Sequence, residues 1–339
     1  MNSEPLRLGS RRSPMAVSQS GEVARLITER TGRRVELVGV TTHGDVSREH
    51  LTQIGGTGVF VSALRDALLR GEVDFAVHSL KDLPTADAPD ITLAALPVRD
   101  DPRDALVARD GAKLADLPSG ARIGTGAPRR AAQLALLRSD VTCVPIRGNA
   151  NTRLAKVREG ELDAVVLAYA GLARIGHTDL VSQIFEPEEM LPAPGQGALA
   201  VECRTADTAL VELLAQVNDA PTRAAVTAER SLLAALEAGC SAPVGAYAVQ
   251  TGAVQTGTVQ AGGGRLRLAG VVLGGPAAAF APGVLDPRAG DGRMVIRDRG
   301  EADAADAARL GRELAARMLA AGAADLMRAE KINGNDAHD

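Results

Sequence analysis

Arginines recur where short apolar runs of the sequence end. Arg11 follows Leu6–Leu8, and Arg129 and Arg130 follow Gly124–Gly126; further arginines stand at comparable points, namely Arg147, Arg153 and Arg174. Guanidinium groups stay charged when partly buried and form paired hydrogen bonds with carboxylates or phosphates. The group therefore predicts an anion site, without distinguishing phosphate from carboxylate. No P-loop pattern ending in Gly-Lys-Ser/Thr is present, which disfavours a nucleotide.

The segment His78–Pro84 places a carboxylate beside a cation. It follows the apolar run Val73–Val77, so we expect Ser79, Lys81 and Asp82 in a loop at the carboxyl end of a strand. A carboxylate in such a place can act as a general acid or base, or stabilise a substrate cation. A salt bridge or a turn cap ahead of the proline explains the same residues equally well.

The three cysteines form an odd set and do not indicate a disulfide framework. Cys143 and Cys203 lie in apolar, strand-like runs and are expected in the core. Cys240 differs, because it lies in a predicted loop after a helix stop. The end of a helix raises the pKa of a nearby thiol, so a covalent bond at Cys240 would need a reactive electrophile. Neither cysteines nor histidines show the spacing of a metal site, and we predict none.

Composition limits the classes of partner. Lys and Arg number 38 against 42 Asp and Glu, which gives a net charge of −4. Aromatic residues make up 2% of the chain, too few for platforms that stack nucleic-acid bases. The N-terminus has no apolar signal core, and no apolar run is long enough to cross a bilayer. We therefore expect a cytoplasmic protein that binds neither nucleic acid nor membrane.

Short strand-like runs alternate with helical stretches, which is typical of an α/β fold. Strands are expected at Leu6–Leu8, Val35–Val40 and Val73–Val77, and helices at Phe60–Leu69 and Ala220–Ala238. A further helical stretch is expected at Glu301–Met327.

Two stretches of the sequence are echoed later in the same order. Arg7–Arg12 is similar to Arg122–Arg130, and Gly71–Val77 is similar to Gly160–Val166. We interpret this order as duplication of a lobe, although short strand and turn patterns also recur by chance. Ligands of such sheets bind beyond the carboxyl ends of the strands.

Pro- and Gly-rich segments set the domain boundaries that we predict. Residues 1–99 and 198–217 would form the first lobe, residues 100–197 the second, and residues 218–330 a smaller α+β domain, with a disordered tail at 331–339. Within the third domain, Val249–Gly264 is expected to be a variable loop or hairpin.

Five motifs together resemble one family, that of porphobilinogen deaminase, also called hydroxymethylbilane synthase. They are His78–Pro84, Gly124–Arg130, Arg147–Arg153, Pro194–Gly197 and Gly239–Pro243, and they occur in the family's order. The similarity runs from about Leu6 to about Met327. It implies two mixed-sheet lobes like those of periplasmic binding proteins, facing a cleft, and a smaller third domain.

The resemblance also implies a chemistry. Such enzymes join four porphobilinogen molecules head to tail, release ammonia each time, and give hydroxymethylbilane for haem and other tetrapyrroles. The growing chain is anchored on a dipyrromethane cofactor, bound as a thioether to the cysteine that Cys240 matches. Asp82 matches the catalytic carboxylate. A monomer is expected.

The resemblance assigns the remaining site residues to two groups. The matches to cofactor-binding positions are Phe60, Ser79, Lys81, Thr125, Arg129, Arg130 and Arg147. The matches to substrate-binding positions are Arg11, Ser13, Arg153, Arg174 and Gln196.

The chain departs from the common bacterial pattern of this family at several positions. His43, Gln53 and Thr57 replace basic residues, and Gly126-Ala127 replaces a serine pair. Residues 249–295 are longer than usual and have no assigned role. A non-catalytic pyrrole or small-anion binder of the same fold is the main alternative. A paralogue that no longer elongates its cofactor and a phosphate-ester enzyme are weaker ones.

Overall fold

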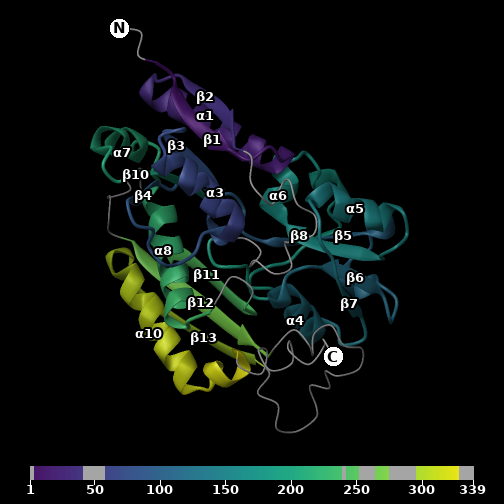
Figure 1. Ribbon diagram of the computed structural model, residues 1–339. Coiled ribbons are helices and arrows are strands. Elements are labelled where there is room, and N and C mark those ends of the chain that lie inside the picture. The colour runs from purple at the N-terminus through teal and green to yellow at the C-terminus, as the bar shows by residue number, and fades with distance from the viewer. Residues whose placement is uncertain (1–3, 41–57, 239–241, 252–263, 275–294, 328–339) are drawn as a thin grey trace, which may run out of the picture. The chain divides into compact units, whose positions relative to one another are not determined.

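The computed structural model describes residues 4–40, 58–238, 242–251, 264–274 and 295–327, with the backbone alone at 58–60. The chain divides into two compact units. The first contains Met1–Asp100 and Gly197–Arg223, and the second contains Asp101–Gln196 and Ala224–Asp339 (Figure 1). In the described ranges, no helix combines the length and the apolar character that crossing a membrane requires.

The first unit is built on a five-stranded mixed sheet of order β2-β1-β3-β10-β4. Its strands are β1 (Leu6–Ser10), β2 (Val35–Gly39), β3 (Phe75–Ser79), β4 (Ile91–Ala95) and β10 (Leu199–Arg204). Its helices are α1 (Pro14–Thr31), α3 (Gly58–Leu69) and α7 (Thr208–Ala215), with a short 3-10 turn η1 (Leu80–Asp82). β1 runs parallel to β2 and β3, whereas β10 runs antiparallel to β3 and β4.

The second unit contains a sheet of the same design, in the order β7-β6-β8-β5-β9. Its strands are β5 (Asp104–Ala108), β6 (Arg122–Thr125), β7 (Thr142–Pro145), β8 (Ala164–Ala168) and β9 (Gln183–Ile184). Its helices are α4 (Pro128–Leu137), α5 (Ala150–Arg158) and α6 (Tyr169–Arg174), with the 3-10 turns η2 (Arg109–Gly111), η3 (Leu114–Asp116) and η4 (Thr178–Leu180). β6 is parallel to β7 and β8, and β5 is antiparallel to β8 and β9.

The two sheets agree in register as well as in order. Leu8 lies opposite Phe75 in the first sheet, as Ile123 lies opposite Ala164 in the second. These pairs fall in the two stretches that the sequence repeats. The predicted duplication of an α/β lobe is therefore confirmed at the level of strand order and register.

An aspartate contact is also repeated. The backbone N–H of Arg7 donates to Asp74 Oδ2 at 2.7 Å, and that of Arg122 donates to Asp163 Oδ2 at 2.8 Å. Each aspartate N–H returns a hydrogen bond to the carbonyl of the same arginine, at 2.8 and 3.0 Å. Each aspartate directly precedes one strand, β3 or β8, and its carboxylate contacts the start of the parallel neighbour of that strand, β1 or β6.

The remainder of the second unit is an antiparallel sheet, β11-β12-β13. It is formed by β11 (Val244–Thr251), β12 (Arg265–Leu273) and β13 (Val295–Asp303), with α8 (Ala220–Ala235), the turn η5 (Ala304–Asp306) and α10 (Ala307–Ala320). Leu232 and Leu314 from the two helices pack over Gly270 of β12. Val271 and Leu273 instead belong to the core that contains Ile123 and Leu134. The small sheet thus shares a core with the second lobe.

Most of the expected elements are present, and the fold class is the predicted one. The predicted helix at Glu301–Met327 is wrong at its start, because β13 continues to Asp303 in register with β12 and α10 begins at Ala307. Ser79 belongs to strand β3 rather than to the expected loop. The cause is the pairing of β3 with β10, which continues to Ser79 opposite Leu199.

Several predictions fall partly or wholly on residues that are not described. The predicted loop at Val249–Gly264 overlaps β11, which extends to Thr251. Residues 252–263 of that loop lie outside the described residues. The predicted disordered tail at 331–339 lies outside them entirely.

Helix α10 lies close to the backbone of α8 at a glycine. A Cβ placed on Gly311 would lie 2.4 Å from the carbonyl oxygen of Ala228 and 2.7 Å from the backbone nitrogen of Leu232. Gly21 in α1 has no heavy atom within 4 Å of the same position. We expect Gly311→Ala to destabilise the protein by about 1–3 kcal/mol, because the helices must separate. Gly21→Ala should stabilise it by about 0.5–1 kcal/mol through helix propensity.

Urea unfolding of both variants, followed by circular dichroism, tests this expectation. Equal effects of the two substitutions would contradict close packing of α8 on α10.

Candidate active site

The predicted site residues of the first unit gather at one edge of its sheet. Arg11 and Ser13 follow the carboxyl end of β1, and Lys81 and Asp82 follow that of β3, its parallel neighbour. Asp82 is the last residue of η1 and is half-buried. This edge is where open α/β sheets bind ligands.

Local hydrogen bonds hold the turn that carries Asp82. Ser79 Oγ accepts from Gln19 Nε2 of α1 at 2.9 Å. The backbone N–H of Leu80 donates to Ala198 O at 3.0 Å, and that of Leu83 closes the turn by donating to Leu80 O at 3.1 Å. Ser13 is the N-cap of α1 and accepts from the N–H of Ala16 at 3.3 Å.

Glu202 of β10 is a buried carboxylate that lies opposite Ala76 of β3. Arg65 of α3 donates to both of its oxygens, at 2.6 and 3.0 Å. His78 Nε2 lies 3.3 Å from Glu202 Oε2. Burial acts to raise the pKa of Glu202, but His78 and Arg65 outweigh it and lower the pKa to about 2. Glu202 therefore stays ionised and ties α3 to the strands β3 and β10.

Predicted site residues of the second unit gather at the equivalent edge. Thr125 ends β6, Arg147 follows β7, and Arg174 ends α6 directly after β8. Thr125 is buried, and its Oγ1 accepts from the N–H of Ala127 at 3.2 Å. Arg147 is exposed and Arg174 is half-buried.

Arg153 of α5 lies close to the turn that follows β6. Its Nε donates to Gly148 O at 2.9 Å. A Cβ on Gly126 would lie 2.6 Å from Ile146 O and 3.8 Å from Arg153 Nη2. The close approach of this carbonyl oxygen leaves no room for a side chain at Gly126. Burial, and then the charge of Arg130, lower the pKa of Arg153.

Arg129 and Arg130, in the first turn of α4, are buried against an aspartate. Arg129 Nη2 lies 2.7 Å from Asp104 Oδ2, and Arg130 Nη2 lies 2.7 Å from Asp104 Oδ1. Gln196 is buried as well, and its Nε2 donates to Asp104 Oδ1 at 2.9 Å. Burial acts to raise the pKa of Asp104, but the two arginine charges outweigh it and lower it to about 2. The structure thus brings together two residues predicted to bind cofactor and one predicted to bind substrate.

The segment from Leu191 to Gln196 connects this cluster to the small sheet. Leu191 O accepts from Arg129 Nη1 and from Gln133 Nε2. The N–H of Gly195 donates to Glu229 Oε2 of α8 at 2.7 Å, and that of Ala248 of β11 donates to Glu229 Oε1 at 2.9 Å. A buried carboxylate on α8 therefore clamps the segment and β11 together.

Other predicted site residues cannot be placed. Phe60 lies in the first turn of α3, and at residues 58–60 only the backbone is described. Cys240 lies outside the described residues, as do His43, Gln53 and Thr57.

The buried carboxylates Asp104, Glu202 and Glu229 were missed by the sequence analysis. Asp104 and Glu202 each lie in a short apolar run, DALVA and LAVECR. A charged residue within a buried strand needs a partner, and that is the signal that could have revealed them. Glu229 lies on a helix next to Arg230, and its sequence offers no comparable signal.

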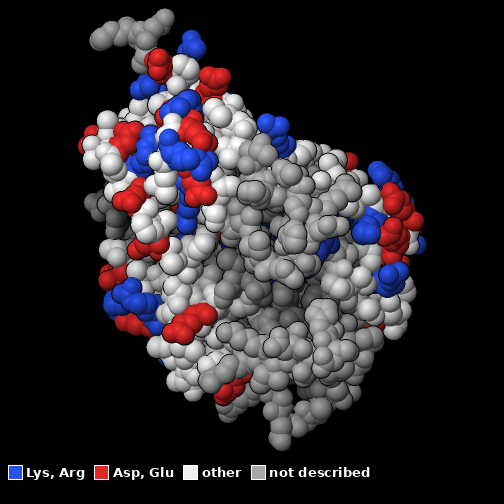
Figure 2. Space-filling view, in the orientation of Figure 1, with Lys and Arg blue, Asp and Glu red and all other residues white. Residues whose placement is uncertain are grey.

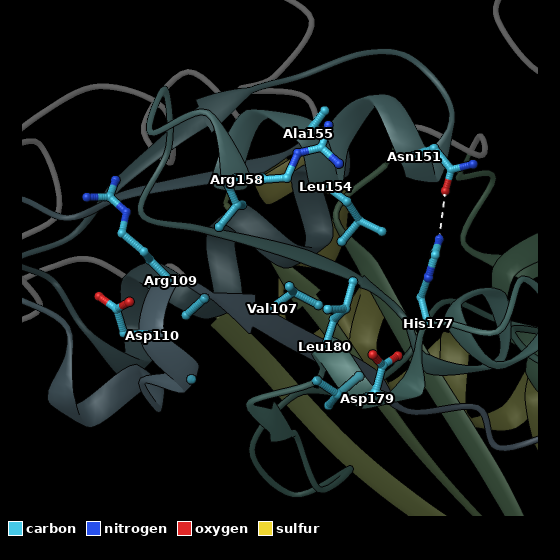
Figure 3. Close-up of a pocket in the computed structure, with 14 residues that line it drawn as sticks. Val107, Arg109, Asp110, Asn151, Leu154, Ala155, Arg158, His177, Asp179 and Leu180 are labelled. Atoms are coloured by element: carbon cyan, nitrogen blue, oxygen red, sulfur yellow. Dashed lines mark hydrogen bonds between the residues drawn. The ribbon is translucent and has the colours of Figure 1, made fainter.

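A separate hollow of about 670 Å³ lies on the second lobe (Figure 3). Val107, Leu154 and Leu180 line its apolar part, and His177 Nε2 lies 3.1 Å from Asn151 Oδ1 at its rim. It contains none of the predicted site residues. Acidic and basic side chains adjoin one another on the face drawn in Figure 2.

Comparison with known proteins supports a cofactor-binding domain followed by a C-terminal domain. The family model described as "Porphobilinogen deaminase, dipyromethane cofactor binding domain" matches residues 6–212, and "Porphobilinogen deaminase, C-terminal domain" matches residues 223–274. The first match alone covers more than half of the chain. The chain belongs to the porphobilinogen deaminase family.

Curated relatives agree with this assignment. A porphobilinogen deaminase of Thermobifida fusca is 68% identical over 249 residues, which cover 73% of this chain and 78% of the relative. Porphobilinogen deaminase 1 of Streptomyces avermitilis is 56% identical over 338 residues, with 96% of this chain and 98% of the relative covered.

Solved structures also show a partial likeness to this chain. The VFT2 domain of Bordetella pertussis BvgS gives a TM-score of 0.38 at 19% identity, covering 63% of this chain and 85% of that one. A periplasmic substrate-binding protein of an ABC transporter from Coxiella burnetii gives 0.39 at 16% identity, covering 62% and 91%. Likeness of this degree says nothing about what this chain binds.

The charges of the second lobe fit the dipyrromethane cofactor of the family. Arg129, Arg130 and Arg153 carry three positive charges against the one carboxylate of Asp104, so a net positive charge is available for carboxylate groups. This excess of positive charge suits a ligand that carries several carboxylates on acetate and propionate arms.

Glu202 makes the stability of the first unit dependent on pH. The fall of its pKa from 4.5 to about 2 corresponds to about 3 kcal/mol. Because the folded-state pKa is lowered, this stability is present above about pH 4.5 and is lost as the pH falls towards 2. We expect Glu202→Gln to lose about 3 kcal/mol at pH 7, and the difference from wild type to shrink below pH 4.5.

Hydrogen exchange of β3 and β10 across this pH range measures the effect in the relevant strands. Glu72→Gln is the control, because the ion pair of Glu72 with Arg70 is exposed. A Glu202→Gln variant as protected as wild type at pH 7 would show that the buried pair contributes nothing.

Proposed function

We propose that the chain is a transferase that condenses four porphobilinogen molecules into hydroxymethylbilane on a dipyrromethane cofactor bound to Cys240. Family membership supports the reaction. The structural observation that supports the site most directly is the repeated placement of charged residues at the carboxyl edges of two duplicated sheets. When bound, dipyrromethane supplies the pyrrole α-carbon to which the first substrate is joined.

The arginines of the second lobe bind the carboxylates of cofactor and substrate. Each pyrrole carries an acetate and a propionate, so the ligand is dense in negative charge. Arg129, Arg130 and Arg147 serve the cofactor, with support from Phe60 and Thr125. Arg153, Arg174 and Gln196 serve the substrate. Guanidinium groups suit this task because they remain charged when buried and bind carboxylates with two parallel hydrogen bonds.

Asp82 is the catalytic residue, and the first lobe positions it. Departure of ammonia from porphobilinogen leaves positive charge on the pyrrole, and a carboxylate beside the pyrrole N–H stabilises that charge. Asp82 also accepts the proton that the attacked pyrrole α-carbon loses. The turn hydrogen bonds of Leu80 and Leu83 keep its backbone in place. Ser79 and Lys81 support the cofactor, and Arg11 and Ser13 support the substrate.

The proposed reaction also suggests where the protein is located and what it binds. A biosynthetic enzyme with a thioether-bound cofactor and reduced cysteines belongs in the cytoplasm. We propose a monomer that binds neither nucleic acid nor membrane. Cys143 and Cys203 are buried, and burial raises their thiol pKa values to about 12 and about 11. Neither therefore competes with Cys240 for an electrophile.

Mass spectrometry of the intact protein can detect the covalent cofactor. Under denaturing conditions, the intact protein is expected to show an added mass equal to two pyrrole units, and Cys240→Ser should lack it. Cys143→Ser is the control and should retain it. Wild-type protein that stays unmodified after expression with ample porphobilinogen would favour the non-catalytic binder.

The role of Asp82 can be tested by steady release of ammonia from porphobilinogen. Asp82→Asn removes the charge and keeps the shape, so we expect the rate to fall by about 100-fold or more while the added mass is retained. Asp87→Asn, an exposed aspartate five residues further on, should leave the rate unchanged. Equal rates for Asp82→Asn and wild type would remove Asp82 from the mechanism.

A further inference from the structure

Asp104 is a fully buried carboxylate that both arginines of the α4 pair contact. Its exposed fraction is 0%, and the side chains of Arg129 and Arg130 are 4% and 7% exposed. Arg129 Nη2 lies 2.7 Å from Asp104 Oδ2 as an ion pair. Arg130 lies at Oδ1, where its Nη2 is 2.7 Å away and its Nε donates a hydrogen bond at 2.9 Å. The sequence resemblance assigns Asp104 no role.

Backbone carbonyls hold each guanidinium on a second side. Arg129 Nη1 donates to Leu191 O, and Arg130 Nη1 donates to Val166 O at 3.2 Å. Gln196 bridges the arrangement, because its Nε2 donates to Asp104 Oδ1 and to Pro102 O while its Oε1 accepts from Arg130 Nη2 at 3.4 Å. Two neighbouring cations are thus fixed in place by groups from β5, β8 and the Leu191–Gln196 segment.

Without Asp104 this arrangement would be electrostatically unfavourable. Burial lowers the pKa of Arg129, and the charge of Arg130 lowers it further. Asp104 opposes both effects. Two arginines and one aspartate leave a net charge of +1, which matches one carboxylate of a ligand rather than two.

We propose that Asp104 is a positioning residue that acts as the counter-ion of Arg129 and Arg130. It holds the two guanidinium groups in place and sets the net charge of the cluster at +1, so that the pair binds a single carboxylate of the cofactor. The proposal rests on the proposed function, in which this pair binds dipyrromethane. On this proposal the pair binds one carboxylate of the cofactor. The remaining carboxylates must bind residues outside the pair, such as Arg147.

The proposal can be tested by the rate at which apo-protein acquires its cofactor. Apo-protein is incubated with porphobilinogen, and the gain of two pyrrole units is followed by intact mass. Asp104→Asn keeps the shape but raises the charge of the cluster to +2 and turns an N–H towards one arginine. We expect loading to slow by about tenfold or more, because small misplacements of binding groups carry costs of this size. Asp101→Asn, which breaks a half-exposed pair with Arg103 nearby, should load at the wild-type rate.

A double variant separates a counter-ion from a merely structural residue. Asp104→Asn combined with Arg129→Met restores the net charge of +1. We expect it to load faster than Asp104→Asn alone, although Arg129 itself is lost. A double variant that loads no faster, or a single variant that loads at the wild-type rate, would overturn the proposal.

The same variants also test the proposal if Asp104→Asn does not fold. Should Asp104→Asn fail to fold, the double variant is expected to fold because its cluster charge is restored, and its failure would also overturn the counter-ion role. Failure of the proposed function is distinguishable, because wild-type protein would then gain no mass at all.

Discussion

Burying a carboxylate removes it from water, and the loss is offset only when cations and donors surround it. The described part of the chain meets this constraint in both units, with Glu202 on β10 and Asp104 on β5. Both strands run antiparallel to the rest of their sheets. The position of α3 relative to β3, and that of α4 relative to β5, therefore depend on an ion pair as well as on apolar packing.

Duplication explains why these two strands are comparable, and why their carboxylates nevertheless differ in role. β10 and β5 occupy the same place in sheets of equal order. Glu202 lies towards the far end of its strand and pairs with Arg65 of the helix that precedes β3. Asp104 begins its strand, at the edge where arginines gather, and pairs with both residues of the α4 pair. The same scaffold thus carries the turn that contains Asp82 in one lobe and a cluster of arginines in the other.

The small antiparallel sheet is part of the second unit rather than an appendage. Val271 and Leu273 pack in the core of the second lobe, and Glu229 joins the Leu191–Gln196 segment to β11. The same segment accepts a hydrogen bond from Arg129. Helix α8, which leads towards Cys240 in the sequence, is in this way connected through buried hydrogen bonds to the arginines that would hold the cofactor.

The sequence by itself was sufficient to indicate the α/β class, the duplication, the family and the list of charged residues at strand ends. Strand ends can be read locally, because a run of apolar residues stops where small and polar residues begin. The same local signals were insufficient at Ser79 and at Glu301–Met327. In both places pairing with a distant strand, β10 or β12, decided that the residues are extended.

Only the tertiary structure decided what the charged side chains contact. The sequence indicates that Arg129 and Arg130 can bind an anion, but Asp104, 25 residues before the first of them, occupies part of their binding capacity. Glu202 meets Arg65 from 137 residues away along the chain. Ion pairs across such separations depend on which strands become neighbours in a sheet, and strand order is a property of the folded chain that local residue patterns do not encode.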